Sequence, residues 1–177
     1  MTKLRVATTW LDGCSGCHMS LLDIDERLIT LAEKIDILYG PLVDFKSIPK
    51  NLDLALVEGA VSNEDDLKKV KKLRKRSKIL VALGDCAVTA NVPAMRNQFG
   101  VPAIMERAYE ENADLNPMHP NTLIPALLPR ARPIHEIVPV DVFIPGCPPP
   151  ADVIYHALCE LIEGRIPDLS DITRFGL

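Results

Sequence analysis

The sequence predicts an α/β fold built on a doubly wound parallel sheet of flavodoxin-like order. Short apolar runs, typical of strands buried on both faces, alternate with segments of helical periodicity. Three of these runs, at 4–9, 78–83 and 141–144, are followed closely by turns rich in glycine or proline that carry cysteines. This alternation is the pattern of open α/β sheets, which bind ligands at the carboxyl ends of their strands.

The apolar runs and the periodic segments give the elements in chain order. We expect strands at 4–9, 36–39, 52–57, 78–83 and 141–144. An amphipathic helix at 18–34 follows the first strand, and a helix at 151–164 closes the chain. The closing helix is predicted by residues that recur at helical spacing, among which Cys159 is expected to be ordinary core: Val153, Ile154, Ala157, Leu158, Leu161 and Ile162.

A further helix is expected between the third and fourth strands. Three apolar residues recur there at helical spacing, namely Leu67, Val70 and Leu73. Ser62 and Asp65 are its expected N-terminal cap, and acidic residues open the helix while basic residues close it. We interpret the basic run at 66–78 as a solvated helix face, with a docking patch for an acidic partner as the alternative.

Four of the five cysteines lie in segments rich in glycine or proline. Cys14 and Cys17 belong to DGCSGC, Cys86 to LGDC and Cys147 to PGCPPP. We interpret them as loop residues that form a metal cage, rather than as core residues or a disulfide. Because all three loops follow the carboxyl ends of expected strands, the fold should bring them to one edge of the sheet.

Four thiolates are the ligand set both of a [4Fe-4S] cluster and of a structural zinc site. Structural zinc sites usually draw their ligands as two close pairs, whereas this chain has one close pair and two scattered single cysteines. The spacing therefore favours an iron-sulfur cluster, and zinc is the alternative.

Two further residues accompany the cysteines. Glu58 follows the third strand, so its carboxylate is expected to share the same crevice, with a solvated loop acid as the alternative. His18 follows Cys17 directly, and because four cysteines complete a cubane, we expect it to hydrogen-bond or pack rather than to ligate iron. A flavodoxin-like fold also suggests FMN as a cofactor. Thiolates in the segment 11–17 would occupy the crevice where FMN binds, so FMN is not expected.

The stretch at 87–140 breaks the alternating pattern. Long regular structure is not expected there, because the stretch contains eight of the fifteen prolines: Pro93, Pro102, Pro117, Pro120, Pro125, Pro129, Pro133 and Pro139. The stretch keeps many apolar residues, so we expect an ordered, irregular cover over the metal site or over a partner surface.

Length and composition set the class of protein. The chain has 177 residues, and we expect one iron-sulfur-binding domain spanning 1–177. Its 47% hydrophobic residues and mean hydropathy of +0.11 suffice for a buried core. A net charge of −4 and 5% aromatic residues argue against nucleic-acid binding. The first residues lack export features and no apolar run approaches the ~20 residues of a membrane span, so we expect a cytoplasmic protein.

These motifs, in this order, resemble the small subunit of nickel-iron hydrogenases. The resemblance is to the short form of the cytoplasmic NAD-reducing (bidirectional) enzymes, which is related to the 20 kDa quinone-reductase subunit family of complex I. It covers nearly the whole chain and rests on four segments: Cys14-Ser-Gly-Cys17-His-Met-Ser, Val57-Glu58-Gly59, Gly84-Asp85-Cys86 and Pro145-Gly146-Cys147-Pro148-Pro149.

The resemblance implies that the four cysteines hold a proximal [4Fe-4S] cluster beside the nickel-iron centre of a separate large subunit. The chain would then relay electrons to diaphorase subunits that carry iron-sulfur clusters and FMN and reduce NAD⁺, and it would perform no bond chemistry itself. Glu58 becomes a candidate for proton handling or for subunit contact.

Two departures refine the resemblance. Longer members carry ligands for two further clusters beyond the point where this chain ends, so one cluster is expected here. The complex I subunit has adjacent cysteines where this chain has Cys14-x-x-Cys17, which favours a hydrogenase. The alternative is a cluster-bearing subunit of a complex I-like or other hydrogenase assembly that uses quinone, ferredoxin or another acceptor.

Overall fold

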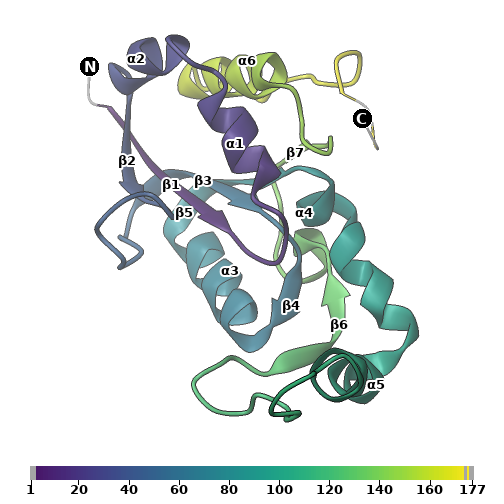
Figure 1. Ribbon diagram of the computed structural model, residues 1–177. Coiled ribbons are helices and arrows are strands. Elements are labelled where there is room, and N and C mark those ends of the chain that lie inside the picture. Colours follow the sequence, from purple (N-terminus) through teal and green to yellow (C-terminus); the bar gives the residue numbers. More distant parts are fainter. Residues whose placement is uncertain (1–2, 174, 176–177) are drawn as a thin grey trace.

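The computed structural model describes residues 3–173 and residue 175 (Figure 1). Five parallel strands form the central sheet in the order β2-β1-β3-β5-β7. This confirms the α/β fold and the flavodoxin-like order that the sequence predicts. The strands are β1 (Leu4–Trp10), β2 (Ile35–Tyr39), β3 (Leu52–Glu58), β5 (Ser77–Leu83) and β7 (Val142–Ile144).

Helices cover both faces of this sheet (Figure 1). The first face carries α1 (Gly16–Leu22), α2 (Arg27–Ala32) and α6 (Ala151–Ile162), and the second carries α3 (Glu64–Arg76) and α4 (Asp85–Thr89). Successive strand residues point to opposite faces, so Val6 joins the core beneath α1 and α6 whereas Ala7 joins the core beneath α3. Burial on both faces explains why these strands read as nearly continuous apolar runs.

The single helix expected at 18–34 is two short helices. α1 ends at Leu22 and α2 begins at Arg27, and between them Asp25 adopts a left-handed conformation with φ of 62°. Aspartate tolerates this conformation better than most residues, so the acidic pair Asp23 and Asp25 favours a turn at this point. Ile24 is nevertheless buried, which keeps the apolar periodicity that predicted a continuous helix.

The cap of α3 also differs from the prediction. Asn63, rather than Ser62 or Asp65, is the N-cap, and its side-chain oxygen accepts hydrogen bonds of 2.9 Å from the backbone N–H groups of Asp65 and Asp66. Ser62 lies in the middle of the short strand β4 (Val61–Asn63), which ends at the N-cap residue. The acidic first turn and the basic last turn of α3 agree with the prediction.

The proline-rich stretch contains more short elements than the sequence indicates. After α4 come η1 (Val92–Gln98), α5 (Gly100–Glu106), η2 (Arg107–Glu111), β6 (Leu127–Arg132) and η3 (Ile134–Glu136). β6 pairs antiparallel with β4, which forms a second, two-stranded sheet beside the main one. α5 and η2 are contiguous, so helical backbone continues from Gly100 to Glu111 and is longer there than the prolines predict, whereas the other elements of the stretch are short.

Candidate metal centre

The carboxyl ends of four neighbouring strands are level with one another. In the sheet, Trp10 pairs with Glu58, Glu58 with Leu83, and Leu83 with Ile144. The segments that carry the four cysteines leave this edge directly after three of these positions. The parallel register therefore delivers residues that are far apart in the chain to one edge of the sheet, as the strand pattern predicts.

The four cysteines differ in environment. Cys14 and Cys147 are exposed and Cys86 is partly buried, whereas Cys17 is 7% exposed and contributes to the apolar core. The expectation that all four are loop residues is wrong for two of them, because Cys17 lies in the first turn of α1 and Cys86 in the first turn of α4. A glycine begins α1 at Gly16 and another directly precedes α4 at Gly84, which is why both turns resemble loops in the sequence.

Cys159 is separate from this set. It lies in α6, is partly buried and packs against the core formed by α1, α6 and the sheet. This is the environment that its apolar neighbours in the sequence predict.

Two glycines leave space for the sulfur atoms. Gly84 has a φ of +82°, and a Cβ atom added to it would lie 2.1 Å from Cys17 Sγ. A Cβ atom on Gly16 would lie 3.2 Å from Cys14 Sγ, which is a tight contact. The backbone at this edge is therefore shaped around the thiols, and Gly84 in particular cannot carry a side chain without displacing one of them.

The thiols also influence one another electrostatically. Burial, together with the charges of Cys147 and Cys14, raises the pKa of Cys86 to about 11. Burial raises the pKa of Cys17 still further, and Glu58 and the other three cysteines add to the rise. A positively charged iron-sulfur core would stabilise the thiolate forms of these buried, mutually repelling groups, so the residues present fit such a group.

Among the described residues, no three His, Cys, Asp or Glu side chains stand close enough together to hold a single metal ion. The candidate site is therefore defined by the shared sheet edge, the space left by glycine and the electrostatic coupling of the thiols.

Polar contacts tie the cysteine segments together. Asp85 is buried, and its Oδ1 accepts a hydrogen bond of 2.6 Å from the backbone N–H of Gly146, while the Asp85 N–H donates to the Gly146 carbonyl over 2.9 Å. The Asn91 side-chain amide lies 3.7 Å from Cys147 Sγ. Asp85 thus links the Cys86 and Cys147 segments, a role that sequence reasoning missed because an acid beside a glycine also suits an ordinary turn.

Glu58 is the other buried acid at this edge. It is 2% exposed, and its Oε1 and Oε2 accept hydrogen bonds from the backbone N–H groups of Cys17 and His18, over 3.3 and 2.9 Å. His18 Nδ1 also contacts Glu58 Oε2. Glu58 is therefore buried against the first turn of α1, which carries Cys17, and its surroundings are not those of a solvated loop acid.

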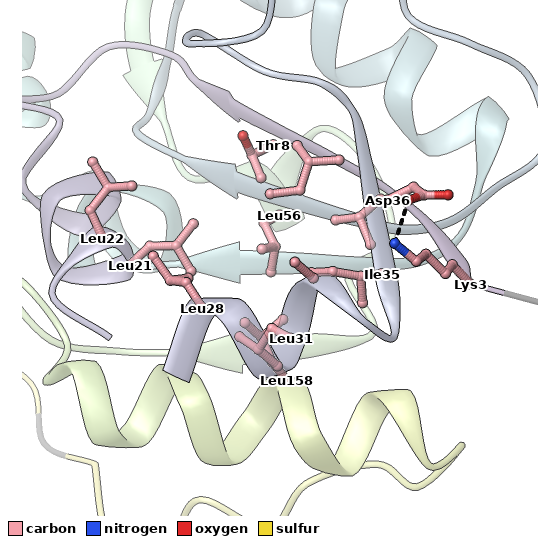
Figure 2. Close-up of a pocket in the computed structure, with 13 residues that line it drawn as sticks. Lys3, Thr8, Leu21, Leu22, Leu28, Leu31, Ile35, Asp36, Leu56 and Leu158 are labelled. Carbon is pink, nitrogen blue, oxygen red and sulfur yellow. Dashed lines mark ion pairs between the residues drawn. The ribbon is translucent and has the colours of Figure 1, made fainter. Parts of the chain in front are cut away.

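An apolar cavity of about 430 Å³ lies between α1, α2, α6 and the strands β1 and β2 (Figure 2). Leu21, Leu31 and Leu158 line it, and the ion pair of Lys3 and Asp36 lies at its margin. None of the four clustered cysteines lines this cavity. No helix in the described part of the chain is long and apolar enough to cross a membrane.

Several hydrogenase subunits are similar to this chain in sequence. The chain is 42% identical to the delta subunit of the NAD-reducing hydrogenase HoxS of Cupriavidus necator, over 98% of this chain and 86% of that one. It is 36% identical to a subunit of the F420-non-reducing hydrogenase vhu of Methanocaldococcus jannaschii, over 94% of this chain. It spans only 58% of the length of that second relative.

Solved structures agree with the sequence relatives. A chain of an NAD⁺-reducing [NiFe]-hydrogenase in the H₂-reduced state superposes with a TM-score of 0.94 at 42% identity, covering 98% of this chain and 99% of that one. A chain of the Dm. baculatum [NiFeSe]-hydrogenase shares the fold at 19% identity, with a TM-score of 0.63, over 99% of this chain and 70% of that one. The family model for the 20 kDa subunit of NADH ubiquinone oxidoreductase matches residues 14–161, which include all four clustered cysteines. The chain therefore belongs to the NADH ubiquinone oxidoreductase 20 kDa subunit family, within which it is similar to hydrogenase subunits over nearly its whole length.

Proposed function

We propose that this chain is the electron-relay small subunit of an NAD-linked nickel-iron hydrogenase, with one [4Fe-4S] cluster held by Cys14, Cys17, Cys86 and Cys147. One observation carries the proposal: four thiols reach one edge of the sheet in a chain that is 42% identical to a subunit of an NAD-reducing hydrogenase along 98% of its length. When bound, such a cluster accepts and donates single electrons.

The residues of the chain would hold the cluster and set its surroundings. Cys17 lies against the apolar core, which keeps water from one side of the site. Asp85 holds the Cys147 segment against α4 through the N–H of Gly146. Burial and hydrogen bonding of this kind are what tune the potential of a cluster, while the four thiolates fix its position.

The exposed side of the site supports a large-subunit partner with the nickel-iron centre. Cys14 and Cys147 are exposed, and large apolar side chains are exposed beside the cysteine segments or in the helical turns after α4: Trp10, Met19, Val92, Met95 and Phe99. Exposed apolar residues around an oxygen-sensitive cluster are expected where a protein partner covers them. Diaphorase subunits that carry iron-sulfur clusters and FMN would then pass the electrons to NAD⁺.

We further propose that residues 1–177 form one iron-sulfur-binding domain that works in the cytoplasm, where soluble NAD⁺ is available as the electron acceptor. The similarity to a subunit of an NAD-reducing enzyme supports this location. The two cores of the fold share one sheet, which supports a single domain.

The proposal is tested on the native complex, purified without oxygen through a tag on this chain. We expect nickel in the complex and H₂-dependent reduction of NAD⁺. Nickel together with H₂-dependent reduction of ferredoxin or a quinone, and no reduction of NAD⁺, would instead favour the alternative hydrogenase assembly. Iron without nickel would favour a complex I-like subunit, and zinc on this chain would contradict an electron relay.

A further inference from the structure

The first turn of α1 carries Cys17 and receives its cap from a distant strand. The N-cap residue, Ser15, has a left-handed φ of 65° and its side chain makes no capping hydrogen bond. Glu58, at the carboxyl end of β3, supplies the missing acceptors, because its two oxygens accept from the N–H groups of Cys17 and His18. The position of Cys17 therefore depends on where the Glu58 carboxylate points.

His18 fixes that direction. Its backbone N–H and its ring Nδ1 both contact Oε2 of Glu58, so two groups of one residue bind the same carboxylate oxygen. The ring can donate from Nδ1, and the carboxylate oxygen can accept. Trp10 packs edge-to-face on the ring, with centroids 5.4 Å apart.

Burial makes this arrangement necessary rather than incidental. Glu58 is 2% exposed and His18 is 6% exposed. A carboxylate removed from water must be satisfied by donors within the protein, and the ring Nδ1–H is the side-chain donor on Oε2. The other ring nitrogen, Nε2, is buried and makes no hydrogen bond. The polar contact of the ring is therefore with Glu58.

We propose that His18 is a positioning residue that holds the Glu58 carboxylate on the first turn of α1 and so holds the Cys17 thiol in the cluster site. This inference rests on the proposed cluster. It assigns His18 a specific task where packing alone would also account for a buried ring. The chemistry needed is a single N–H donor at the place of Nδ1, which an asparagine amide can supply and an alanine cannot.

The test compares His18→Ala, His18→Asn and a control, His156→Ala, whose side chain is exposed on α6, in the complete complex. The measured quantities are the rate at which a chelator removes iron from this chain and the electron paramagnetic resonance spectrum of the reduced cluster. We expect His18→Ala to lose iron roughly tenfold faster, because a hydrogen bond to a buried charge is lost, and to alter the spectrum. His18→Asn and His156→Ala should retain iron and spectrum as the unmodified chain does.

An unchanged rate and spectrum in His18→Ala would overturn the inference, and so would equal losses in His18→Asn and His18→Ala. If His18→Ala cannot be recovered in the complex, His18→Asn decides: retention of iron supports the positioning role and loss rejects it. Lack of iron in the unmodified chain would contradict the proposed function instead, so the two failures are distinguishable.

Discussion

Gly84 and Cys17 are in direct contact across the sheet edge, since a Cβ atom on Gly84 would lie 2.1 Å from Cys17 Sγ. Gly84 precedes α4 and the carbonyl of Ile144 accepts a 2.7 Å hydrogen bond from its N–H, so it is held between two strand ends and cannot move aside easily. The backbone of one cysteine segment therefore forms the wall behind the thiol of another.

Gly84→Ala is expected to displace the Cys17 thiol and to deplete iron. The left-handed φ alone should cost about 1 kcal/mol or more, and the clash adds to it. Gly164→Ala is the matched control, because Gly164 has a similar φ of +77° with no atom within 4 Å of an added Cβ. Iron per chain and the melting temperature measure the effect. Equal iron contents in the two variants would show that Gly84 does not shape the site.

Asp85→Ala is expected to release the Cys147 segment. The substitution leaves the buried N–H of Gly146 without its acceptor, at a cost of about 1–3 kcal/mol. Asp85→Asn keeps an oxygen acceptor and should retain more iron than Asp85→Ala. The check is iron per chain in the purified complex. The linking role would be refuted if both variants retained as much iron as the unmodified chain.

Asn63→Ala should destabilise α3 without disturbing the cysteine segments. It removes the acceptor for two backbone N–H groups, which costs about 1 kcal/mol and should lower the melting temperature by a few degrees. Ser62→Ala, at the cap that the sequence suggests, should have a smaller effect, because the hydroxyl makes only a 3.5 Å contact with Asp66. Thermal unfolding monitored by circular dichroism decides between the two cap positions.

Sequence patterns predicted the sheet well because burial on both faces leaves an apolar run at each strand. Strand ends could therefore be located, and with them the edge that gathers Cys14, Cys86 and Cys147. The expected cap of α3 differs from the observed one by one residue, since Ser62 and Asn63 are both good cap residues and the helix begins at Glu64, directly after Asn63.

The contacts around the cysteines were beyond sequence analysis for a different reason. Glu58 and His18 lie 40 residues apart. No local sequence pattern predicts that a residue at the end of β3 caps the distant helix α1. The break between α1 and α2 was hidden because the buried Ile24 preserves the apolar period through the turn. Tertiary packing decides such details, so the sequence predicted which residues gather but not how they hold one another.

The most direct test of the central claim is the iron and acid-labile sulfide bound to this chain in the unmodified complex and in five single variants. These are Cys14→Ser, Cys17→Ser, Cys86→Ser, Cys147→Ser and Cys159→Ser. The account predicts about four irons and four sulfides in the unmodified chain and in Cys159→Ser, with loss of this content in each of the other four. Zinc in place of iron, or full iron and sulfide in any of those four variants, would contradict it.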